Sequence, residues 1–517
     1  MRRVNKVLVA NRGEIAVRVI RTCRELGIRT VAVFSDADRA APHVLMADEA
    51  YYLGQSPSRE SYLMIDKVLE AAKSSRADAI HPGYGFLSEN EGFARRVQSE
   101  GLVFVGPSPE AIGLMGDKIQ ARRIVRRAGV PIVPGTDEPI VEEQAAFSFV
   151  EKHGFPVLIK AAGGGGGKGM RVVKAKGEFT AAFRSAQSEA LTAFGDGRVY
   201  LEKYLDHPRH IEFQILADEH GNTIHLGERE CSIQRRHQKV IEESPSTIVD
   251  DDLRKKMGEI AVVAARSCGY VNAGTIEFLV DRNRNFFFLE MNTRLQVEHP
   301  ITEMRTGIDL VGEQIRIARG EPLAYTQEEV TFRGHAIECR IYAEDPRNGY
   351  LPSTGRIHHL RPSQGFGIRD DRGIESGGDV SVYYDPMISK LISWGRSREE
   401  ALRRMLRALG EYEILGVETN IPLNIAVLQH PRFIDGDFDT HFLDECFSSL
   451  PESALASHEA AAAVAVGAML HARQESKMSL VSASGVNHSR SATGQADRPV
   501  ESKRWKDTRG RSFRGTQ

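Results

Sequence analysis

The chain has 517 residues, and its 68 Lys and Arg against 70 Asp and Glu give a formal net charge of −2. This balance gives no electrostatic reason to expect nucleic acid or a membrane surface as a partner, and no apolar run approaches the length of a membrane span. A chain of this length is expected to form about three domains.

The cysteines and the first residues bear on the compartment. Residues 1–5 lead directly into a predicted strand, without the apolar region of a secretory signal. The five cysteines are widely spaced and form no C-x-x-C pair: Cys23, Cys231, Cys268, Cys339 and Cys446. This pattern predicts reduced thiols rather than disulfides or a zinc site, so we expect a soluble, cytoplasmic protein.

The amino-terminal segment alternates strand and helix patterns. Residues 6–10 and 30–34 are apolar runs typical of buried strands, and residues 14–25 between them have the apolar spacing of a helix. This order predicts a parallel α/β unit. The turn at residues 11–13 lacks the G-x-G-x-x-G of dinucleotide sites, so no such site is expected there.

A loop at residues 81–86 follows another predicted strand, residues 77–80. Open α/β sheets usually bind ligands at the carboxyl ends of their strands. Tyr84 and Gly85 in this loop are therefore candidate ligand contacts. A simple turn with a packed Tyr84 is equally compatible with the local sequence.

Five consecutive glycines occupy residues 163–167, flanked by Lys160 and Lys168. Without Cβ atoms, such a run can turn its N–H groups toward an anion. Apolar residues predict strands at 155–159 and 170–173, so the loop tips a β-hairpin and is not a Walker A motif, which would lead into a helix. A lid that closes over a nucleotide is the functional interpretation, and a plain linker is the alternative.

The neighbouring segments predict a helix and a sheet. Residues 118–127 form a basic helix pattern, and residues 130–135 look like a hinge into the smaller subdomain that carries the glycine hairpin. Residues 208–216 and 223–226 alternate with period two, which predicts antiparallel strands. A basic cluster follows at residues 234–239, where a solvated face and an anion site are both compatible with the sequence.

Two apolar strands at residues 274–280 and 285–291 are joined by a polar turn. A turn centred between Asn283 and Arg284 would place Glu277 directly opposite Glu290, with Cβ atoms about 5 Å apart. Two facing carboxylates destabilise a sheet unless a cation lies between them. Carboxylate oxygens together with nucleotide phosphates are what Mg²⁺ favours, so this hairpin predicts a metal site.

The second strand is expected to continue to residue 298 with polar residues on one face. Metal and oxyanion binding would suit this mixture of side chains, and an ordinary solvent-facing strand is the alternative. The polar face would hold Glu290, Asn292, Arg294, Gln296 and Glu298, and the opposite face Met291, Thr293, Leu295 and Val297.

These motifs resemble the biotin carboxylase subunits of the ATP-grasp superfamily over about residues 3–448. The resemblance rests on the glycine loop, residues 115–118, residues 234–239 and residues 290–300, which occur in the same order. It implies an α/β and α+β fold: an amino-terminal parallel α/β domain (1–117), an ATP-grasp domain (118–330) with a mobile glycine-hairpin lid at about 132–205, and a carboxy-terminal mixed α+β domain (331–448). Residues 449–517 are expected to be a largely disordered tail, in which residues 454–473 could form an Ala-rich helix and residues 474–517 are poor in apolar residues.

The resemblance also implies the site residues. ATP would contact Lys118, Lys160, Gly166, Gly167, Glu202, Lys203, Tyr204, Leu205, His210, Gln234, His237, Glu277 and Glu290. Two Mg²⁺ (or Mn²⁺) ions would bind Glu277 and Glu290, with Asn292 assisting. Bicarbonate would contact Lys239, Arg294, Gln296 and Val297, and biotin would contact Tyr84, Gly85 and Arg340. The expected catalytic residues are Arg294, Glu298, Lys239 and Arg340.

The implied chemistry begins with transfer of the γ-phosphoryl group of ATP to bicarbonate, because bicarbonate itself is a poor electrophile. Glu298 is expected to be the general base for bicarbonate, kept ionised by nearby Arg294. The resulting carboxyphosphate would release carbon dioxide beside biotin. Arg340 would stabilise the negative oxygen that biotin develops.

The expected partners are a biotin carboxyl carrier protein and carboxyltransferase subunits, and the chain is expected to be a homodimer. Biotin would be carried by a separate protein, because the sequence contains no Ala-Met-Lys-Met motif. The acyl acceptor, acetyl-CoA, propionyl-CoA or pyruvate, is left open. Another ATP-grasp ligase that couples a carboxylate to an amine, and a non-catalytic scaffold, are the alternative functions.

Overall fold

The computed structural model describes residues 1–136, 138–162, 170–236 and 238–447 of the chain. The glycine loop with the candidate ATP contacts Gly166 and Gly167 lies outside the described residues, as do His237 and the tail expected at 449–517. The described residues belong to one compact unit. Within them, no helix combines the length and apolar composition needed to cross a membrane.

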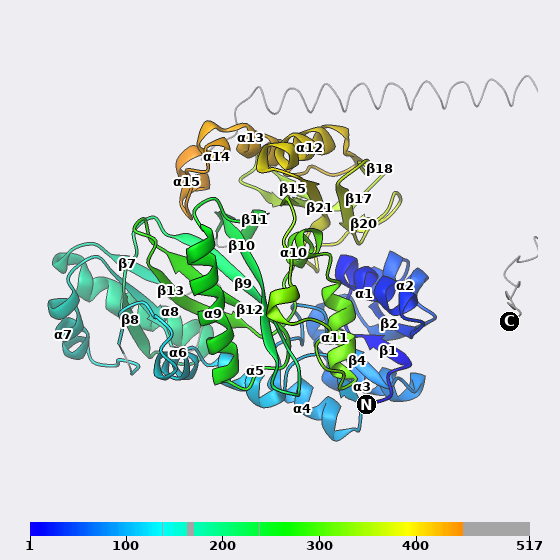
Figure 1. Ribbon diagram of the computed structural model, residues 1–517, viewed down its shortest axis with the longest axis horizontal. Coiled ribbons are helices and arrows are strands. Elements are labelled where there is room, and N and C mark those ends of the chain that lie inside the picture. Colours follow the sequence, from blue (N-terminus) through cyan, green and yellow to red (C-terminus); the bar gives the residue numbers. More distant parts are fainter. Residues whose placement is uncertain (137, 163–169, 237, 448–517) are drawn as a thin grey trace, which may run out of the picture. The chain divides into compact units, whose positions relative to one another are not determined.

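A five-stranded parallel sheet forms the amino-terminal part, in the order β3-β2-β1-β4-β5 (blue in Figure 1). This arrangement confirms the predicted parallel α/β unit. Its strands are β1 (Lys6–Val9), β2 (Arg29–Ser35), β3 (Glu49–Gly54), β4 (Ala79–His81) and β5 (Val103–Phe104). Its helices are α1 (Gly13–Glu25), α2 (Pro42–Met46), α3 (Ile65–Ser75), α4 (Glu91–Ser99) and α5 (Pro109–Gly116).

The predicted glycine hairpin is confirmed by the strands on either side of the loop. β6 (Val157–Ala161) pairs antiparallel with β7 (Arg171–Val173) and with β8 (Val199–Lys203). The nearby helices are α6 (Lys118–Arg127), α7 (Glu143–His153) and α8 (Phe179–Phe194). α6 starts where predicted because Asp117 caps it, with its side chain accepting hydrogen bonds from the N–H groups of Ile119 and Gln120.

The largest sheet in the described residues has eight antiparallel strands in the order β13-β12-β9-β10-β11-β14-β21-β19. Its strands are β9 (Arg209–Ala217), β10 (Thr223–Arg235), β11 (Gln238–Ser244), β12 (Asn272–Val280), β13 (Phe286–Asn292), β14 (His335–Tyr342), β19 (Ile368–Arg372) and β21 (Met387–Gly395). The associated helices are α9 (Asp251–Ser267), which packs against β9 and β10 (green in Figure 1), α10 (His299–Thr306) and α11 (Leu310–Ala318). Because β11 pairs with β14, strands on either side of the expected boundary near residue 330 share one sheet.

The pairing of Glu277 with Glu290 is confirmed, but its geometry differs from the prediction. The N–H of Asp281 donates to the carbonyl oxygen of Asn285 at 2.9 Å, so the turn is centred on Asn283. A β-bulge next to Glu277 then shifts the register by one residue and makes Glu277 and Glu290 cross-strand partners.

The predicted extension of this strand to residue 298 is wrong. β13 ends at Asn292, and Glu298 is the N-cap residue of α10. Pro300, in the first turn of α10, is the local signal of that helix start, because proline is favoured where the N–H has no helical partner.

The carboxy-terminal part is mixed α+β, as expected, and its helices cover the end of the large sheet (yellow in Figure 1). The helices are α12 (Arg398–Glu411), α13 (Ile421–Gln429), α14 (Pro431–Ile434) and α15 (Phe442–Cys446). Short strand pairs are formed by β15 (Glu344–Asp345) with β16 (Leu351–Pro352), β17 (Gly355–Arg356) with β20 (Asp379–Val380), and β18 (His359–Arg361) with β22 (Glu413–Leu415).

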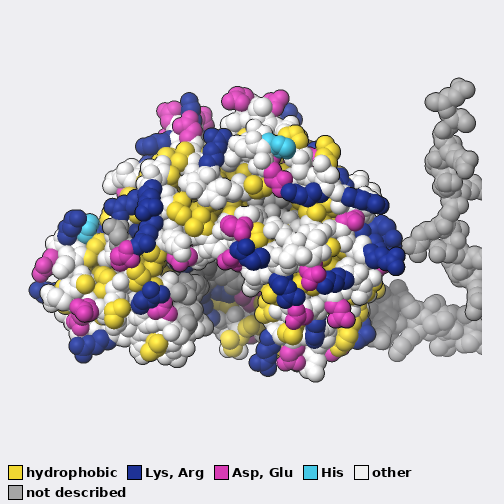
Figure 2. All heavy atoms as spheres, turned by 90° about the horizontal axis from the view of Figure 1, so that it is seen from below, with side chains coloured by type: hydrophobic (Ala, Val, Ile, Leu, Met, Phe, Trp, Pro, Cys, Tyr) yellow, Lys and Arg dark blue, Asp and Glu magenta, His cyan; other side chains and the backbone are white. Residues whose placement is uncertain are grey.

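On the face in Figure 2, Lys and Arg side chains are interspersed with Asp and Glu.

Candidate active site

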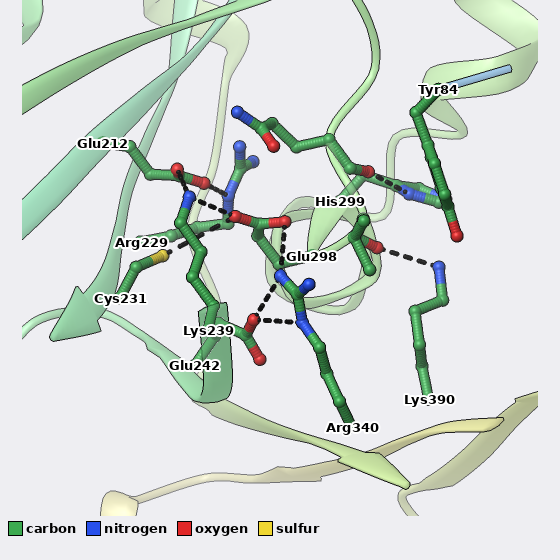
Figure 3. Close-up of polar contacts among 12 residues, drawn as sticks. Tyr84, Glu212, Arg229, Cys231, Lys239, Glu242, Glu298, His299, Arg340 and Lys390 are labelled. Atoms are coloured by element: carbon green, nitrogen blue, oxygen red, sulfur yellow. Dashed lines mark hydrogen bonds and ion pairs between the residues drawn. The ribbon is translucent and has the colours of Figure 1, made fainter. Parts of the chain in front are cut away.

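Glu298 lies at the centre of a buried cluster of charged side chains (Figure 3). Its carboxylate has no exposed surface, and it is held between two cations. Lys239 Nζ on β11 lies 2.6 Å from Oε1, and Arg340 Nη2 on β14 donates to Oε2 at 3.0 Å. The pairing of β11 with β14 brings these two cations to the same carboxylate.

Lys239 joins three carboxylates. Besides Glu298, its ammonium lies 2.6 Å from Glu212 Oε2 and 3.0 Å from Glu277 Oε1. Burial alone would lower the pKa of Lys239, but the three negative neighbours outweigh it and raise the pKa well above its usual value. Lys239 is therefore a permanent positive charge in this site.

The same charges keep Glu298 ionised. Burial would raise the pKa of the Glu298 carboxyl group, but Lys239, Arg340 and Arg229 together hold it well below its usual value. Arg294, which was expected to do this, interacts electrostatically with Glu298, while the cations in direct contact with Glu298 are Lys239 and Arg340.

Arg294 is placed beside the cluster by other partners. Its Nε donates to Glu89 Oε2 at 3.0 Å, and its Nη atoms donate to Gln296 Oε1 and Asn292 Oδ1, each at 3.1 Å. Asn292 and Gln296 in turn donate to Glu277 Oε1 at 2.9 and 3.2 Å. The polar side chains expected on one strand face therefore gather at Glu277 even though the strand itself ends earlier.

Three candidate nucleotide contacts form a chain on the other side of Glu277. Gln234 Nε2 lies 2.8 Å from His210 Nδ1, and His210 Nε2 lies 2.9 Å from Glu277 Oε2. Burial disfavours the charged imidazole, but the Glu277 carboxylate outweighs it and raises the pKa of His210. In return, Lys239 and His210 overcome the burial of Glu277 and lower the pKa of its carboxyl group.

The other candidate ATP contacts that the structure describes lie on and around β8 and α6. Lys160 Nζ is 2.5 Å from Glu202 Oε2, and Lys118 Nζ is 3.6 Å from Glu290 Oε2. Lys203 Nζ donates to the carbonyl oxygen of Phe155 at 3.0 Å. Tyr204 and Leu205 follow β8 and are both partly buried. A cavity of about 860 Å³ beside Lys118 is lined by Ala162, the residue before the glycine loop.

A cavity of about 460 Å³ brings together the predicted biotin and bicarbonate contacts. Tyr84, Gly85 and Arg340 line it together with Arg294 and Val297. These residues come from the β4–α4 loop, from β14 and from the segment after β13, so the fold assembles them from three distant parts of the chain. Gln296 lies next to this cavity and hydrogen-bonds to Arg294.

Glu14, which lines this cavity, and its partner Lys390 were not predicted. Tyr84 donates a hydrogen bond from its hydroxyl group to Glu14 Oε1, and Lys390 Nζ lies 3.2 Å from Glu14 Oε2. Lys390 also donates to the carbonyl oxygen of Val297 at 2.8 Å (Figure 3). Burial raises the pKa of Glu14 to about 7, against the opposing effect of Lys390. Contacts over such sequence distances leave no local signal.

Glu212, Arg229 and Glu242 were also missed. Glu212 and Arg229 are cross-strand partners on β9 and β10 with fully buried side chains, and Arg340 Nε donates to Glu242 Oε1 at 2.6 Å. Burial raises the pKa of Glu242 to about 7, although Arg340 opposes this shift. Charged residues in these strands were the available signal, but the sequence alone does not show that both faces of the sheet are covered.

The metal candidates have the right donor chemistry for Mg²⁺. Glu277 and Glu290 supply carboxylate oxygens and Asn292 an amide oxygen, the ligand types that this ion prefers. The two carboxylates supply the paired negative charge that a magnesium ion requires. Cationic side chains balance this charge in the structure, Lys239 facing Glu277 and Lys118 facing Glu290.

Comparisons with known proteins agree with this fold. Three family models match the chain: "Biotin carboxylase, N-terminal domain" at residues 3–112, "Carbamoyl-phosphate synthase L chain, ATP binding domain" at residues 117–326, and "Biotin carboxylase C-terminal domain" at residues 338–445.

Similar proteins cover the same region. A pyruvate carboxylase component from Methanothermobacter thermautotrophicus is 54% identical over 441 residues, which are 85% of this chain and 90% of that protein. The biotin carboxylase of Nostoc sp. is 53% identical over 85% of this chain and 99% of its own length. A crystal structure of the biotin carboxylase domain dimer of Hydrogenobacter thermophilus 2-oxoglutarate carboxylase, in complex with MgADP, ADP and bicarbonate, has a TM-score of 0.83 and 49% identity, covering 86% of this chain and 98% of that one.

The fold and the matching domains are those of an ATP-grasp enzyme, an ATP-dependent carboxylase ligase. The chain belongs to the biotin carboxylase family, which carries out the biotin carboxylation half-reaction of carboxylases.

Proposed function

We propose that the chain carboxylates biotin on a separate carrier protein, using ATP and bicarbonate through carboxyphosphate. The observation that carries this proposal is the position of Glu298, held ionised between Lys239 and Arg340 next to the cavity that Tyr84 and Arg294 line. A base, an anion site and a space for a planar ligand are thus adjacent. This arrangement suits a reaction in which bicarbonate is activated beside its acceptor.

The proposed first step moves the γ-phosphoryl group of ATP onto an oxygen of bicarbonate and releases ADP. Lys239, Arg294, Gln296 and the backbone of Val297 would hold bicarbonate, and Glu298 would accept its proton. Positioning and charge neutralisation supply most of the rate in phosphoryl transfer, and Lys239 and Arg294 would contribute to both.

In the second step, carboxyphosphate would break down to carbon dioxide and phosphate, and a bond would form between carbon dioxide and N1 of biotin. As N1 loses its proton, negative charge develops on the ureido oxygen. Arg340, with Tyr84 and Gly85 beside it, would donate hydrogen bonds to that oxygen.

Two Mg²⁺ (or Mn²⁺) ions would be held by Glu277 and Glu290, with Asn292 assisting. When bound with ATP, the ions would neutralise phosphate charge. Lys118, Lys160, His210 and Gln234 would orient the nucleotide, together with Glu202, Lys203, Tyr204 and Leu205. Gly166, Gly167 and His237 complete the proposed set.

The proposed partners are a biotin carboxyl carrier protein and the carboxyltransferase subunits of an acetyl-CoA, propionyl-CoA or pyruvate carboxylase. We also propose a homodimer, supported by the dimeric biotin carboxylase domain of the Hydrogenobacter thermophilus protein. The proposed domains are residues 1–117, 118–330 and 331–448, with a tail at 449–517.

The direct test supplies the purified chain with ATP, labelled bicarbonate and free biotin. We expect labelled carboxybiotin and ADP to form in equal amounts. ATP consumption that depends on an amine and not on biotin would instead identify another ATP-grasp ligase, and the absence of any ATP turnover would favour a scaffold.

Changing Glu277 to Gln is expected to raise the Mg²⁺ concentration that gives half-maximal ATP hydrolysis by at least about tenfold, because one of the two metal-binding charges is lost. Glu313→Gln is the matched control, since Glu313 is buried in α11 and pairs with Arg316 rather than with the metal-site residues. Phosphate release measured over a range of Mg²⁺ concentrations checks this. An unchanged Mg²⁺ dependence in Glu277→Gln would contradict the proposed metal site.

Biotin supplied by a separate protein predicts that the purified chain carries no biotin. A streptavidin blot of the chain, expressed together with a biotin protein ligase, should therefore be blank, while a known carrier protein on the same blot is labelled. A labelled band at the full mass of the chain would contradict the proposal that biotin is carried in trans.

A further inference from the structure

Two distant segments bring two histidines and an aspartate together beside the proposed nucleotide contact Tyr204. His207 lies between β8 and β9, and Asp439 and His441 precede α15. The backbone N–H of Thr440 donates to the carbonyl oxygen of Pro208 at 3.1 Å, which ties the segments together at this point. One ligand atom from each of the three side chains lies within 4.8 Å of the others.

From this arrangement we propose that His207, Asp439 and His441 form a binding site for a divalent transition-metal ion of the Zn²⁺ type. Tetrahedral zinc with ligand bonds of about 2.0–2.1 Å has donor atoms about 3.3 Å apart. His207 Nδ1 lies 3.0 Å from Asp439 Oδ2, and His441 Nδ1 lies 3.7 Å from Asp439 Oδ1. Small side-chain rotations would bring these donors onto one ion.

The outer nitrogens of both histidines face groups that would orient the rings. His441 Nε2 is 3.1 Å from the Tyr204 hydroxyl oxygen, and His207 Nε2 is 3.6 Å from Asp206 Oδ1. In metal sites, the second N–H of a ligating histidine is commonly held by such an oxygen, which leaves the other nitrogen free for the ion. Asp439 Oδ1 is fixed by the backbone N–H of His441 at 2.8 Å.

One ligand atom lacks a hydrogen bond in the described structure. His441 Nδ1 is buried and has no hydrogen-bonding partner among the described residues. The side chains of His207 and His441 are 27% and 36% exposed, so an ion can enter from solvent. His207 has a φ of +49°, an uncommon backbone conformation that turns its side chain toward Asp439.

The choice of metal follows from the ligands. Imidazole nitrogens favour Zn²⁺ and related ions, whereas Mg²⁺ prefers oxygen ligands only, so this site is chemically separate from the one proposed at Glu277 and Glu290. Glu445 is a candidate fourth ligand, because its Oε1 lies 3.6 Å from His207 Nδ1. Its other oxygen accepts a hydrogen bond from Arg432 at 2.9 Å.

The test uses the full chain after treatment with a chelator and desalting. The chain is titrated with Zn²⁺ in a calorimeter, and elemental analysis then counts the zinc that is bound. We expect His207→Asn and Asp439→Asn each to lose one equivalent of zinc or to bind it at least about tenfold more weakly. His220→Asn, which removes an exposed histidine from the turn between β9 and β10, should leave the count unchanged.

Zinc should also raise the thermal unfolding midpoint of the unaltered chain by more than that of Asp439→Asn, because an ion that binds only the folded state stabilises it. Zinc held at the active-site carboxylates would persist in both variants and so does not affect the comparison. Equal zinc stoichiometry and affinity in the unaltered chain and in both variants would overturn the proposal and identify the cluster as a hydrogen-bonded ion-pair network. No nucleotide or biotin is needed, so this outcome is independent of the proposed function.

Discussion

Replacing Glu298 with Gln is expected to lower both bicarbonate-dependent ATP hydrolysis and biotin carboxylation by roughly 10²–10⁴-fold, the usual range for loss of a general base. Gln keeps the size of the side chain but cannot accept a proton at neutral pH. The ionised Glu298 is also the partner of Lys239 and Arg340, so the variant leaves both cations without their shared carboxylate. Phosphate release and labelled carboxybiotin measure the two activities.

The control for Glu298→Gln is Glu313→Gln, a change of the same kind at another buried glutamate. It should retain both activities. Binding of MgADP to Glu298→Gln, measured by calorimetry, should stay close to that of the unaltered chain, because Glu298 is not among the proposed nucleotide contacts. ATP hydrolysis at the normal rate in Glu298→Gln would show that another group accepts the proton.

Arg340→Ala should lower biotin carboxylation by roughly 10²–10³-fold, the effect of losing one donor to a developing oxyanion. Bicarbonate-dependent ATP hydrolysis without biotin should fall less, because that step precedes the charge on biotin. Lys239→Ala should damage both activities, since Lys239 is proposed to hold bicarbonate. The ratio of carboxybiotin to phosphate, measured side by side in the two variants, decides between these roles.

The contact between Arg340 and Glu298 adds a pH effect to this prediction. Arg340 is one of the positive charges that hold the pKa of Glu298 below its usual value, so its removal raises that pKa. The acid limb of the pH profile for ATP hydrolysis should therefore move to higher pH in Arg340→Ala. Arg398→Ala, which removes an arginine from Glu243 on β11, should leave the profile in place.

Equal losses of both activities in Arg340→Ala, with an unchanged circular dichroism spectrum and an unshifted pH profile, would contradict this division of roles. Arg340 would then serve the phosphoryl step directly. A shifted profile with a selective loss of carboxybiotin would support both proposed effects of the guanidinium group.

Local features of the chain were predictable from the sequence. The strand and helix periods of residues 6–34, the hairpin around the glycine loop and the pairing of Glu277 with Glu290 are all confirmed. Each depends on residues close together in the chain, where turn chemistry and periodicity act directly. The motifs at residues 115–118, 234–239 and 290–300 were sufficient to indicate the family.

The strand predicted at residues 293–298 shows the limit of periodicity. Alternating polar residues fit a strand there, yet the chain leaves the sheet at Asn292 and starts α10 at His299. Alternation describes only where side chains could point. Whether a strand continues depends on backbone hydrogen bonds with a neighbouring strand. The residues of α10 instead form backbone hydrogen bonds within the helix.

The family, the local hairpins and most of the residues proposed for the site could be predicted from the amino-acid sequence. Which charged side chains contact one another depends on the tertiary structure. Lys239 and Arg340 meet at Glu298 because β14 pairs with β11, a pairing between segments about a hundred residues apart that no local pattern specifies. The same sheet order buries Glu212, Arg229 and Glu242 around Lys239 and Arg340, and burial is what turns these ordinary strand residues into a coupled cluster, because charges removed from water must find partners.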